Sequence, residues 1–303
     1  MTYSIIAFDP DTRECGVAVQ SHYFSVGSIV TWAEPGIGAV ATQATVDVAY
    51  GPRGLERMRA GRTAPEALAE LVAADRLGQV RQVAMLDVHG GIAAHTGSEC
   101  MAFAGQRVGH HHSCQANLMR TGEVWDAMSE AYLGASGPLA ERLIDALDAG
   151  EAAGGDLRGR QSAAVLVVPA EGEPWQRKIE LRVEDHEDPL GELRRLARLG
   201  SSYQLVREAD EIFAAGEEER ANELYIKAWE RLPESHELKF WASLAMVERG
   251  EDERAIPLLR EAIDEHPDWR LVVDMLTKGL SPSIERVRGL LGDYGAPGGA
   301  GPT

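Results

Sequence analysis

The sequence predicts an α+β protein in two parts: a four-layer αββα sandwich over residues 1–190 and a small all-α region over residues 191–292. Up to residue 188, stretches of strand-like residues alternate with pairs of helical patterns, and only helical patterns follow. Because the helices come in pairs, and not singly between strands, repeated βαβ crossovers are disfavoured. Two mainly antiparallel sheets, packed face to face with a helix pair outside each sheet, would bury the apolar faces of the strands and helices.

The chain opens with four predicted strands. Residues 2–8 are β-branched and aromatic and end at the turn signal Asp9-Pro10-Asp11, and residues 16–20 are their natural hairpin partner. Residues 28–32 and 38–42 are predicted to form two more strands around Pro35-Gly36.

Helices and further strands follow in the same part. Thr63 is the expected N-cap of one helix, with Glu66 three residues later to complete a capping box. The predicted helices cover residues 52–60, 65–74, 122–133 and 138–149. The predicted strands cover residues 82–88, 91–96, 100–106, 111–116, 162–168 and 178–183.

The helical region contains a 34-residue repeat. At this shift Gly216, Leu224, Ala228 and Pro233 recur as Gly250, Leu258, Ala262 and Pro267. This period and these markers are typical of tetratricopeptide repeats, which usually need about three copies to stand alone. The two copies are therefore expected to pack on flanking helices, at residues 189–199 and 281–291, or on the main domain. Residues 293–303 are rich in Gly and Pro and are predicted to be a disordered tail.

Composition narrows the possible partners and location. The net charge of −18 argues against nucleic acid, whose binders need a basic surface. No apolar run approaches the ~20 residues of a membrane helix. The three cysteines include no close-spaced pair, so neither a disulfide framework nor a zinc site of thiolates is expected. A cytoplasmic location fits best, since no leader-like segment precedes the first strand.

Thr2 is the leading catalytic candidate. Removal of Met1, which is typical when the next residue is small, would leave Thr2 with a free α-amine beside its own hydroxyl. An α-amine has a pKa near 8, so it could take the hydroxyl proton as Thr2 attacks a carbonyl. The alternative is that Thr2 is an ordinary second residue of a cytosolic protein.

Five other residues are candidates for the same site. Ser4 lies two residues along the first strand on the same face, so it could assist Thr2, compete with it or simply fill a strand position. Asn117 could donate a hydrogen bond to an oxyanion or could cap a turn. Thr42, Gln43 and Arg53 are candidates for lining a substrate pocket.

The loop at residues 155–162 gathers charged and polar side chains before a predicted buried strand. Asp156 or Ser162 could orient the terminal amine of Thr2. Arg158 and Arg160 could clamp a substrate carboxylate through bidentate hydrogen bonds. The alternative is an internal ion-pair loop.

The run His110-His111-His112 does not predict a metal site. Consecutive strand residues point to opposite faces, so these rings would not converge on one ion. His95 and His22 are further possible ligands, but their spacing to this run matches no known metal-binding motif. We therefore expect neither a metal nor another cofactor.

Several segments resemble the family named domain of unknown function 1028. They are Thr2–Pro10, Gly16–Ser21, Gly36–Gln43, Tyr50–Gly54, Ala94–Gly97, Gln115–Asn117 and Gly154–Ala163. The resemblance covers about residues 1–190. It implies the αββα fold of the N-terminal nucleophile (Ntn) hydrolases, with Thr2 as nucleophile. Proteasome-like Ntn hydrolases also use a lysine near the nucleophile, but none precedes Lys178 here, which disfavours proteasome-type proteolysis.

Two functions remain open. The first is an Ntn amidohydrolase that cleaves the C–N bond of a small amide through an acyl-enzyme on Thr2. The second is a non-catalytic binding or assembly protein whose helical repeats recruit a peptide or protein. A homo-oligomer is expected in either case.

Overall fold

The protein's structure, a computed structural model, describes residues 2–296 and divides into two compact units. The division lies between Ala197 and Arg198, inside helix α6 (Pro189–Ala214), whereas the sequence places it at residue 190. We name residues 2–197 the sheet unit and residues 198–296 the helical unit. Of the predicted tail, residues 297–303 lie outside the described part of the chain. Tyr294 donates its hydroxyl to the carboxylate of Asp264 at 2.7 Å.

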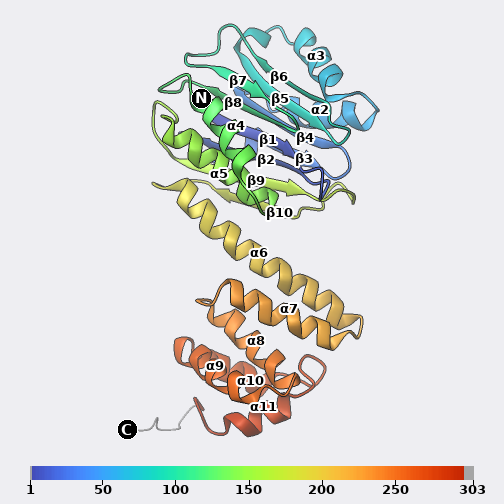
Figure 1. Ribbon diagram of the computed structural model, residues 1–303, viewed down its shortest axis with the longest axis vertical. Coiled ribbons are helices and arrows are strands. Elements are labelled where there is room, and N and C mark those ends of the chain that lie inside the picture. The colour runs from blue at the N-terminus through green and yellow to red at the C-terminus, as the bar shows by residue number, and fades with distance from the viewer. Residues whose placement is uncertain (1, 297–303) are drawn as a thin grey trace. The chain divides into compact units, whose positions relative to one another are not determined.

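The sheet unit contains two sheets whose neighbouring strands all pair antiparallel (Figure 1). Over the described residues, the larger sheet has the strand order β10-β9-β2-β1-β8-β7 and the smaller one β3-β4-β5-β6. The larger sheet comprises β1 (Thr2–Phe8), β2 (Cys15–Ser21), β7 (Gly105–Val108), β8 (His112–Asn117), β9 (Ser162–Val168) and β10 (Ile179–Val183). The smaller sheet comprises β3 (Thr31–Glu34), β4 (Gly38–Ala44), β5 (Arg81–Asp87) and β6 (Ile92–Thr96).

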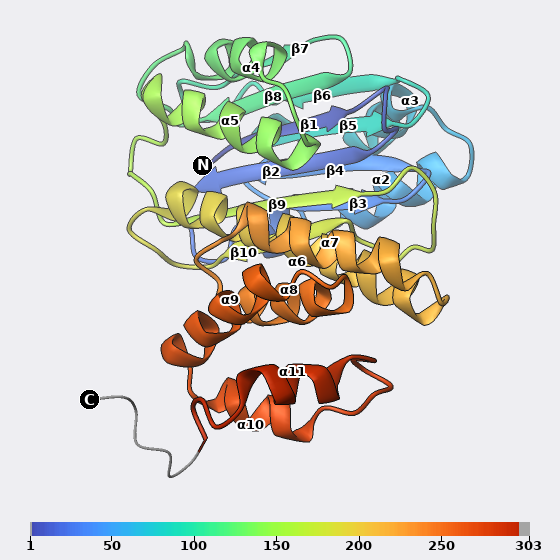
Figure 2. The same ribbon diagram turned by 60° about the horizontal axis from the view of Figure 1, so that its bottom comes forward.

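Two helix pairs cover the outer faces of the sheets. Figure 2 shows α4 (Val124–Gly134) and α5 (Leu139–Ala152) on one side of the strands, with α2 (Tyr50–Arg59) and α3 (Ala64–Ala74) on the other. Thr63 and Glu66 form the predicted capping box of α3. A short 3₁₀ turn, Gly78–Val80, precedes β5.

Two predicted strands are wrong in part. Of residues 100–106, only Gly105 and Gln106 are extended, at the start of β7. Residues 28–32 were expected to be extended, but Gly27–Val30 forms the one-turn helix α1, and β3 begins only at Thr31. Val26 and Val30 lie four residues apart and are both buried in the layer between the sheets. A helical turn places such a pair on one face, so tertiary packing overrides the β preference of the sequence.

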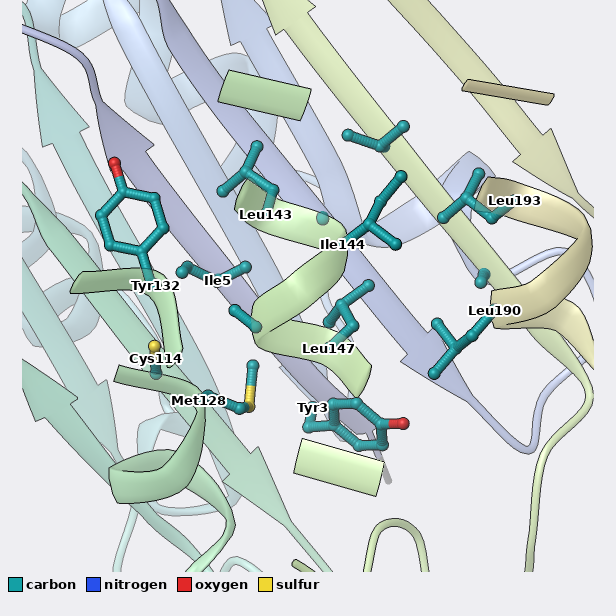
Figure 3. Packing of buried hydrophobic residues seen from close by; sticks show 14 of the residues in the cluster. Tyr3, Ile5, Cys114, Met128, Tyr132, Leu143, Ile144, Leu147, Leu190 and Leu193 are labelled. Atoms are coloured by element: carbon teal, nitrogen blue, oxygen red, sulfur yellow. The ribbon is translucent and has the colours of Figure 1, made fainter. Parts of the chain in front are cut away.

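The apolar core between the larger sheet and helices α4 and α5 shows which side chains of β1 point outward. Figure 3 shows Tyr3 and Ile5 packed with Met128 of α4 and with Ile144 and Leu147 of α5. Since successive strand residues point to opposite faces, the even-numbered residues of β1 point to the layer between the sheets. This layer is apolar around Ile6 and Phe8.

The helical unit begins with the end of α6. It continues with α7 (Glu218–Arg231), α8 (His236–Glu248), α9 (Asp252–Glu265), α10 (Asp268–Met275) and α11 (Ile284–Leu291). Ala228 and Ala262 of the predicted repeats are fully buried, in α7 and α9. Gly216 and Gly250 have φ values of +87° and +79°, the left-handed conformation that commonly ends a helix. No helix in the described part of the chain is long and apolar enough to span a membrane.

Candidate active site

The layer between the sheets changes from apolar to polar toward the start of β1. Several neutral polar residues are buried there, and we name seven of them the polar cluster: Thr2, Ser4, Ser21, Gln43, Gln82, Gln115 and Asn117. Burying so many polar groups costs free energy unless each one finds a hydrogen-bond partner. Their interactions therefore indicate what the cluster holds in place.

Thr2 lies where three strands of the larger sheet meet. It pairs with Ser21, the last residue of β2, and with Asn117, the last residue of β8. Its hydroxyl donates to Ser21 Oγ at 3.0 Å, and only 4% of the residue is exposed. The hydroxyl of Thr2 is thus held by a neutral partner and not by a charged one.

Gln82 of β5 crosslinks the two sheets through its side-chain amide. Its Nε2 donates to the carbonyl of Ala116 at 2.9 Å and to Thr96 Oγ1 at 2.8 Å. Its Oε1 accepts from Gln43 Nε2 at 2.7 Å and from Asn117 Nδ2 at 2.9 Å. The same two amide nitrogens also contact the carbonyl of Thr2, at 3.2 and 3.4 Å. Gln82 therefore positions the groups that hold the backbone of Thr2.

The hydroxyl of Ser4 is fully engaged within the polar cluster. It donates to Gln43 Oε1 at 2.7 Å and accepts from Gln115 Nε2 at 2.6 Å, with no surface exposed. A hydroxyl held on both sides in this way is a poor nucleophile. Of the roles left open for Ser4, the structure favours the structural one.

Thr42 and Arg53 lie apart from the polar cluster. Thr42 follows Ala41 of β4, so it points away from the inter-sheet layer, and its hydroxyl donates to the carbonyl of Asp47 at 3.0 Å. Arg53 lies in α2 and lines a separate cavity of about 630 Å³, together with Trp32 and Arg182. Only Gln43 of the three predicted pocket residues contacts Thr2.

The loop before β9 supports the end of β2. The carboxylate of Asp156 is fully buried, accepts from Arg158 Nη2 at 2.7 Å and accepts from the backbone N–H of His22 at 3.2 Å. Ser162 Oγ donates to the carbonyl of Tyr23 and accepts from the N–H of Val26. Both residues therefore fix the segment that follows Ser21.

Arg160 makes ion pairs with carboxylates of the same unit. Its guanidinium lies 2.9 Å from Asp188 and 3.7 Å from Glu151. Arg158 likewise pairs with Asp156. The arrangement agrees with the ion-pair alternative for this loop.

The comparisons with known proteins concern the sheet unit. Residues 2–193 match the family of unknown function DUF1028. The chain belongs to this family. It is also similar to the crystal structure of the DUF1028 protein SPO2555 from Silicibacter pomeroyi, with 31% sequence identity and a TM-score of 0.60, over 65% of this chain and 88% of that chain. A comparison with curated proteins finds no match.

The histidine run occupies a turn and one strand end of the DUF1028 unit. His110 and His111 precede β8, and His111 has a φ of +64°, so only His112 lies in a strand. His112 Nε2 lies 2.8 Å from Ser129 Oγ, and its Nδ1 lies 3.1 Å from the carbonyl of His110. Among residues 2–296, no three His, Cys, Asp or Glu side chains are grouped so as to hold a metal ion.

We expect this DUF1028 protein to lose stability in mild acid through His112. Burial is the main cause that lowers the pKa of this ring, and the charges of Arg107 and Arg142 lower it further. The unfolded chain takes up the proton at about pH 6.5, whereas the folded chain resists it until lower pH. The free energy of unfolding should therefore fall as the pH drops below about 6.5, because the unfolded state then binds more protons.

Urea unfolding between about pH 7.5 and 5.5 measures this effect. A His112→Gln variant should show a shallower loss of stability on acidification than the unchanged protein. Equal pH slopes for the two proteins would show that His112 does not carry the effect.

Three members of the polar cluster were not predicted from the DUF1028 sequence as site residues: Ser21, Gln82 and Gln115. The register of the β1–β2 hairpin could have identified Ser21, because Thr2 and Ser21 lie at its open end. No local signal identifies Gln82, which reaches Asn117 from the other sheet.

Proposed function

We propose that this protein is an Ntn amidohydrolase that cleaves a small amide through Thr2 after removal of Met1. The proposal rests on the position of Thr2, which begins β1 at the polar end of the inter-sheet layer, with its hydroxyl 3.0 Å from Ser21 Oγ. The layering of two sheets between helix pairs supports the assignment to the αββα fold of Ntn hydrolases. Membership in DUF1028 fits this proposal but names no reaction.

The proposed reaction needs only the first residue and water. The α-amine of Thr2 takes the hydroxyl proton while Oγ1 forms a bond to the amide carbonyl carbon. The C–N bond then breaks, and the proton passes to the departing amine, which leaves an ester on Thr2. Water, deprotonated by the same amine, hydrolyses this ester and restores the hydroxyl.

The neighbouring residues have positioning roles in this proposal. Ser21 accepts from the hydroxyl of Thr2 and so selects its rotamer. Gln43 and Asn117 bind the carbonyl of Thr2, which fixes the backbone that carries the amine. Because the side chain that accepts from the hydroxyl of Thr2 is the neutral Ser21, the α-amine itself is the proposed base.

Thiol catalysis has less support at this site. Burial raises the pKa of Cys15 to about 12 and also raises the pKa of Cys114. Both thiols therefore stay protonated near neutral pH, and a thiol is a weaker nucleophile than a thiolate.

The helical unit supports a second proposal, that it is a pair of tetratricopeptide-like repeats that recruits a protein or peptide. Gly216 and Gly250, which both have a positive φ, lie 34 residues apart, as do two fully buried alanines, Ala228 and Ala262. Such repeats characteristically bind partners along a concave face. The homo-oligomer expected from the sequence stays a prediction.

Inserting one alanine between Met1 and Thr2 tests the proposed function. Removal of Met1 would then leave Ala-Thr, so the side chain of Thr2 is unchanged but its nitrogen is part of a peptide bond. We expect the unmodified protein to release amine from members of a panel of small amides and the insertion variant to release none. Equal turnover by the two proteins would contradict the proposed base. Circular dichroism provides the folding control.

A further inference from the structure

Five large apolar side chains are exposed near the Thr2 end of the sheet unit. We name them the apolar rim. They are Tyr23, Phe24, Met101, Phe103 and Leu157, which are 53%, 63%, 48%, 52% and 48% exposed. Single exposed apolar residues are ordinary on a protein surface, whereas a group of them commonly marks a binding site.

Two members of the rim follow directly from the strand that holds the hydroxyl of Thr2. Strand β2 ends at Ser21, opposite Thr2, so Tyr23 and Phe24 come just beyond this end. Ser162 Oγ donates to the carbonyl of Tyr23 and keeps this segment beside the start of β9.

The other three members flank the strand on the opposite side of β1. Strand β8 ends at Asn117, also opposite Thr2, and Leu118 follows. The N–H of Leu118 donates to the carbonyl of Met101 at 2.9 Å, and its carbonyl accepts from the N–H of Leu157 at 3.1 Å. Phe103 is held by the adjacent bond from the N–H of Met119, at 3.2 Å.

Two exposed apolar residues elsewhere in the sheet unit provide a contrast. Val108 lies at the far end of β7, and Trp175 lies in the connection that leaves β9 at the end away from Ser162. Neither is near a partner of Thr2. Three separate segments that carry exposed apolar side chains thus follow, or hydrogen-bond to, the strand ends beside Thr2.

Two arginines near the rim are already paired with carboxylates of the chain, whereas Arg120 donates to the carbonyl of Leu157. Arg158 binds Asp156, and Arg160 binds Asp188 and Glu151. An acidic ligand would have to displace these pairs and would also meet a chain of net charge −18. The pairing of Arg158 and Arg160 and the negative net charge therefore disfavour a ligand carboxylate, which these two arginines alone had suggested.

We propose that the apolar rim binds the acyl part of the amide, and that this part is uncharged and apolar. The inference rests on the proposed function of Thr2, because it assigns the substrate class of that site. The acyl part becomes bonded to Thr2 in the first step and stays bonded until water releases it in the second, so it lies beside Thr2 throughout the reaction. Burial of this part against aromatic and aliphatic side chains supplies the affinity.

Binding to a Thr2→Ala variant tests recognition without turnover. The probes are coumarin amides that share one amine and differ in their acyl group: octanoyl, acetyl or succinyl. We expect the octanoyl amide to bind at least about tenfold more tightly than the succinyl amide. Adding Phe24→Ser and Leu157→Ser should remove most of this preference, whereas Trp175→Ser, the matched exposed control, should leave it unchanged. Equal binding of both probes, or an equal loss in the control, would overturn the inference.

Hydrolysis of the same amides by the unmodified protein separates this inference from the proposed function. The kcat/KM values are expected to follow the order octanoyl, acetyl, succinyl. Selective binding of the octanoyl amide without any hydrolysis would support the rim as an apolar site and contradict catalysis by Thr2. Hydrolysis with no preference for apolar acyl groups would support Thr2 and overturn the rim proposal.

Discussion

A Thr2→Ala variant is expected to lose amide hydrolysis by a factor on the order of 10³ to 10⁶, the range seen when a covalent nucleophile is removed. The variant keeps the α-amine and removes only the hydroxyl that donates to Ser21. Its fold should persist, because the backbone contacts of Thr2 with Gln43 and Asn117 do not involve that hydroxyl.

Two variants control this experiment. Thr2→Ser keeps the hydroxyl and the amine and should retain measurable turnover. Thr12→Ala removes an exposed hydroxyl in the turn at the other end of the β1–β2 hairpin and should retain full turnover. Steady-state kcat/KM on the best amide of the panel is the readout. Turnover by Thr2→Ala at the level of the unmodified protein would show that another group carries the reaction.

Replacing Gln82 with alanine is expected to destabilise the sheet unit by about 3–5 kcal/mol. The change leaves the amides of Gln43 and Asn117 without the oxygen between them. It also removes the amide nitrogen that donates to the carbonyls of Ala116 and Gly105. Each buried polar group that loses its partner costs about 1–3 kcal/mol, and water entering the space would offset part of the loss.

The readout for Gln82→Ala must be local, because a chain of two units need not unfold in one step. Hydrogen exchange of peptides from β1, followed across a urea titration, reports the stability of the sheet unit alone. Gln161→Ala is the matched control, since its amide bonds Asp185 at the surface, and it should change stability by about 0.5 kcal/mol or less. Equal effects of the two substitutions would contradict a crosslinking role for Gln82.

Local patterns predicted much of the fold. The alternation over residues 2–8 and 16–20 identified the β1–β2 hairpin, and Thr63 with Glu66 identified the start of α3. These signals are readable because hairpins and caps are made by residues close together in sequence. The prediction failed at Gly27–Val30 because distant partners in the inter-sheet core decided the local conformation.

The candidate site was less predictable, because the sheets bring together residues that are distant in sequence. Thr2 and Asn117 were chosen from their chemistry and do lie together. Gln82 contacts Asn117 across the two sheets, and no spacing in the chain signals that contact. Thr42 and Gln43 are neighbours with similar chemistry, yet the pleat of β4 points only Gln43 toward Thr2.

The chemistry proposed here depends on a free α-amine at Thr2, and the intact mass of the purified protein tests this most directly. Mass spectrometry before and after brief reaction with an activated octanoyl ester, quenched in acid, measures both the first residue and its reactivity. We predict a mass that lacks Met1 and then gains one octanoyl group, which fragmentation locates on Thr2. A chain that retains Met1, or that acquires the octanoyl group elsewhere and not on Thr2, would contradict the account.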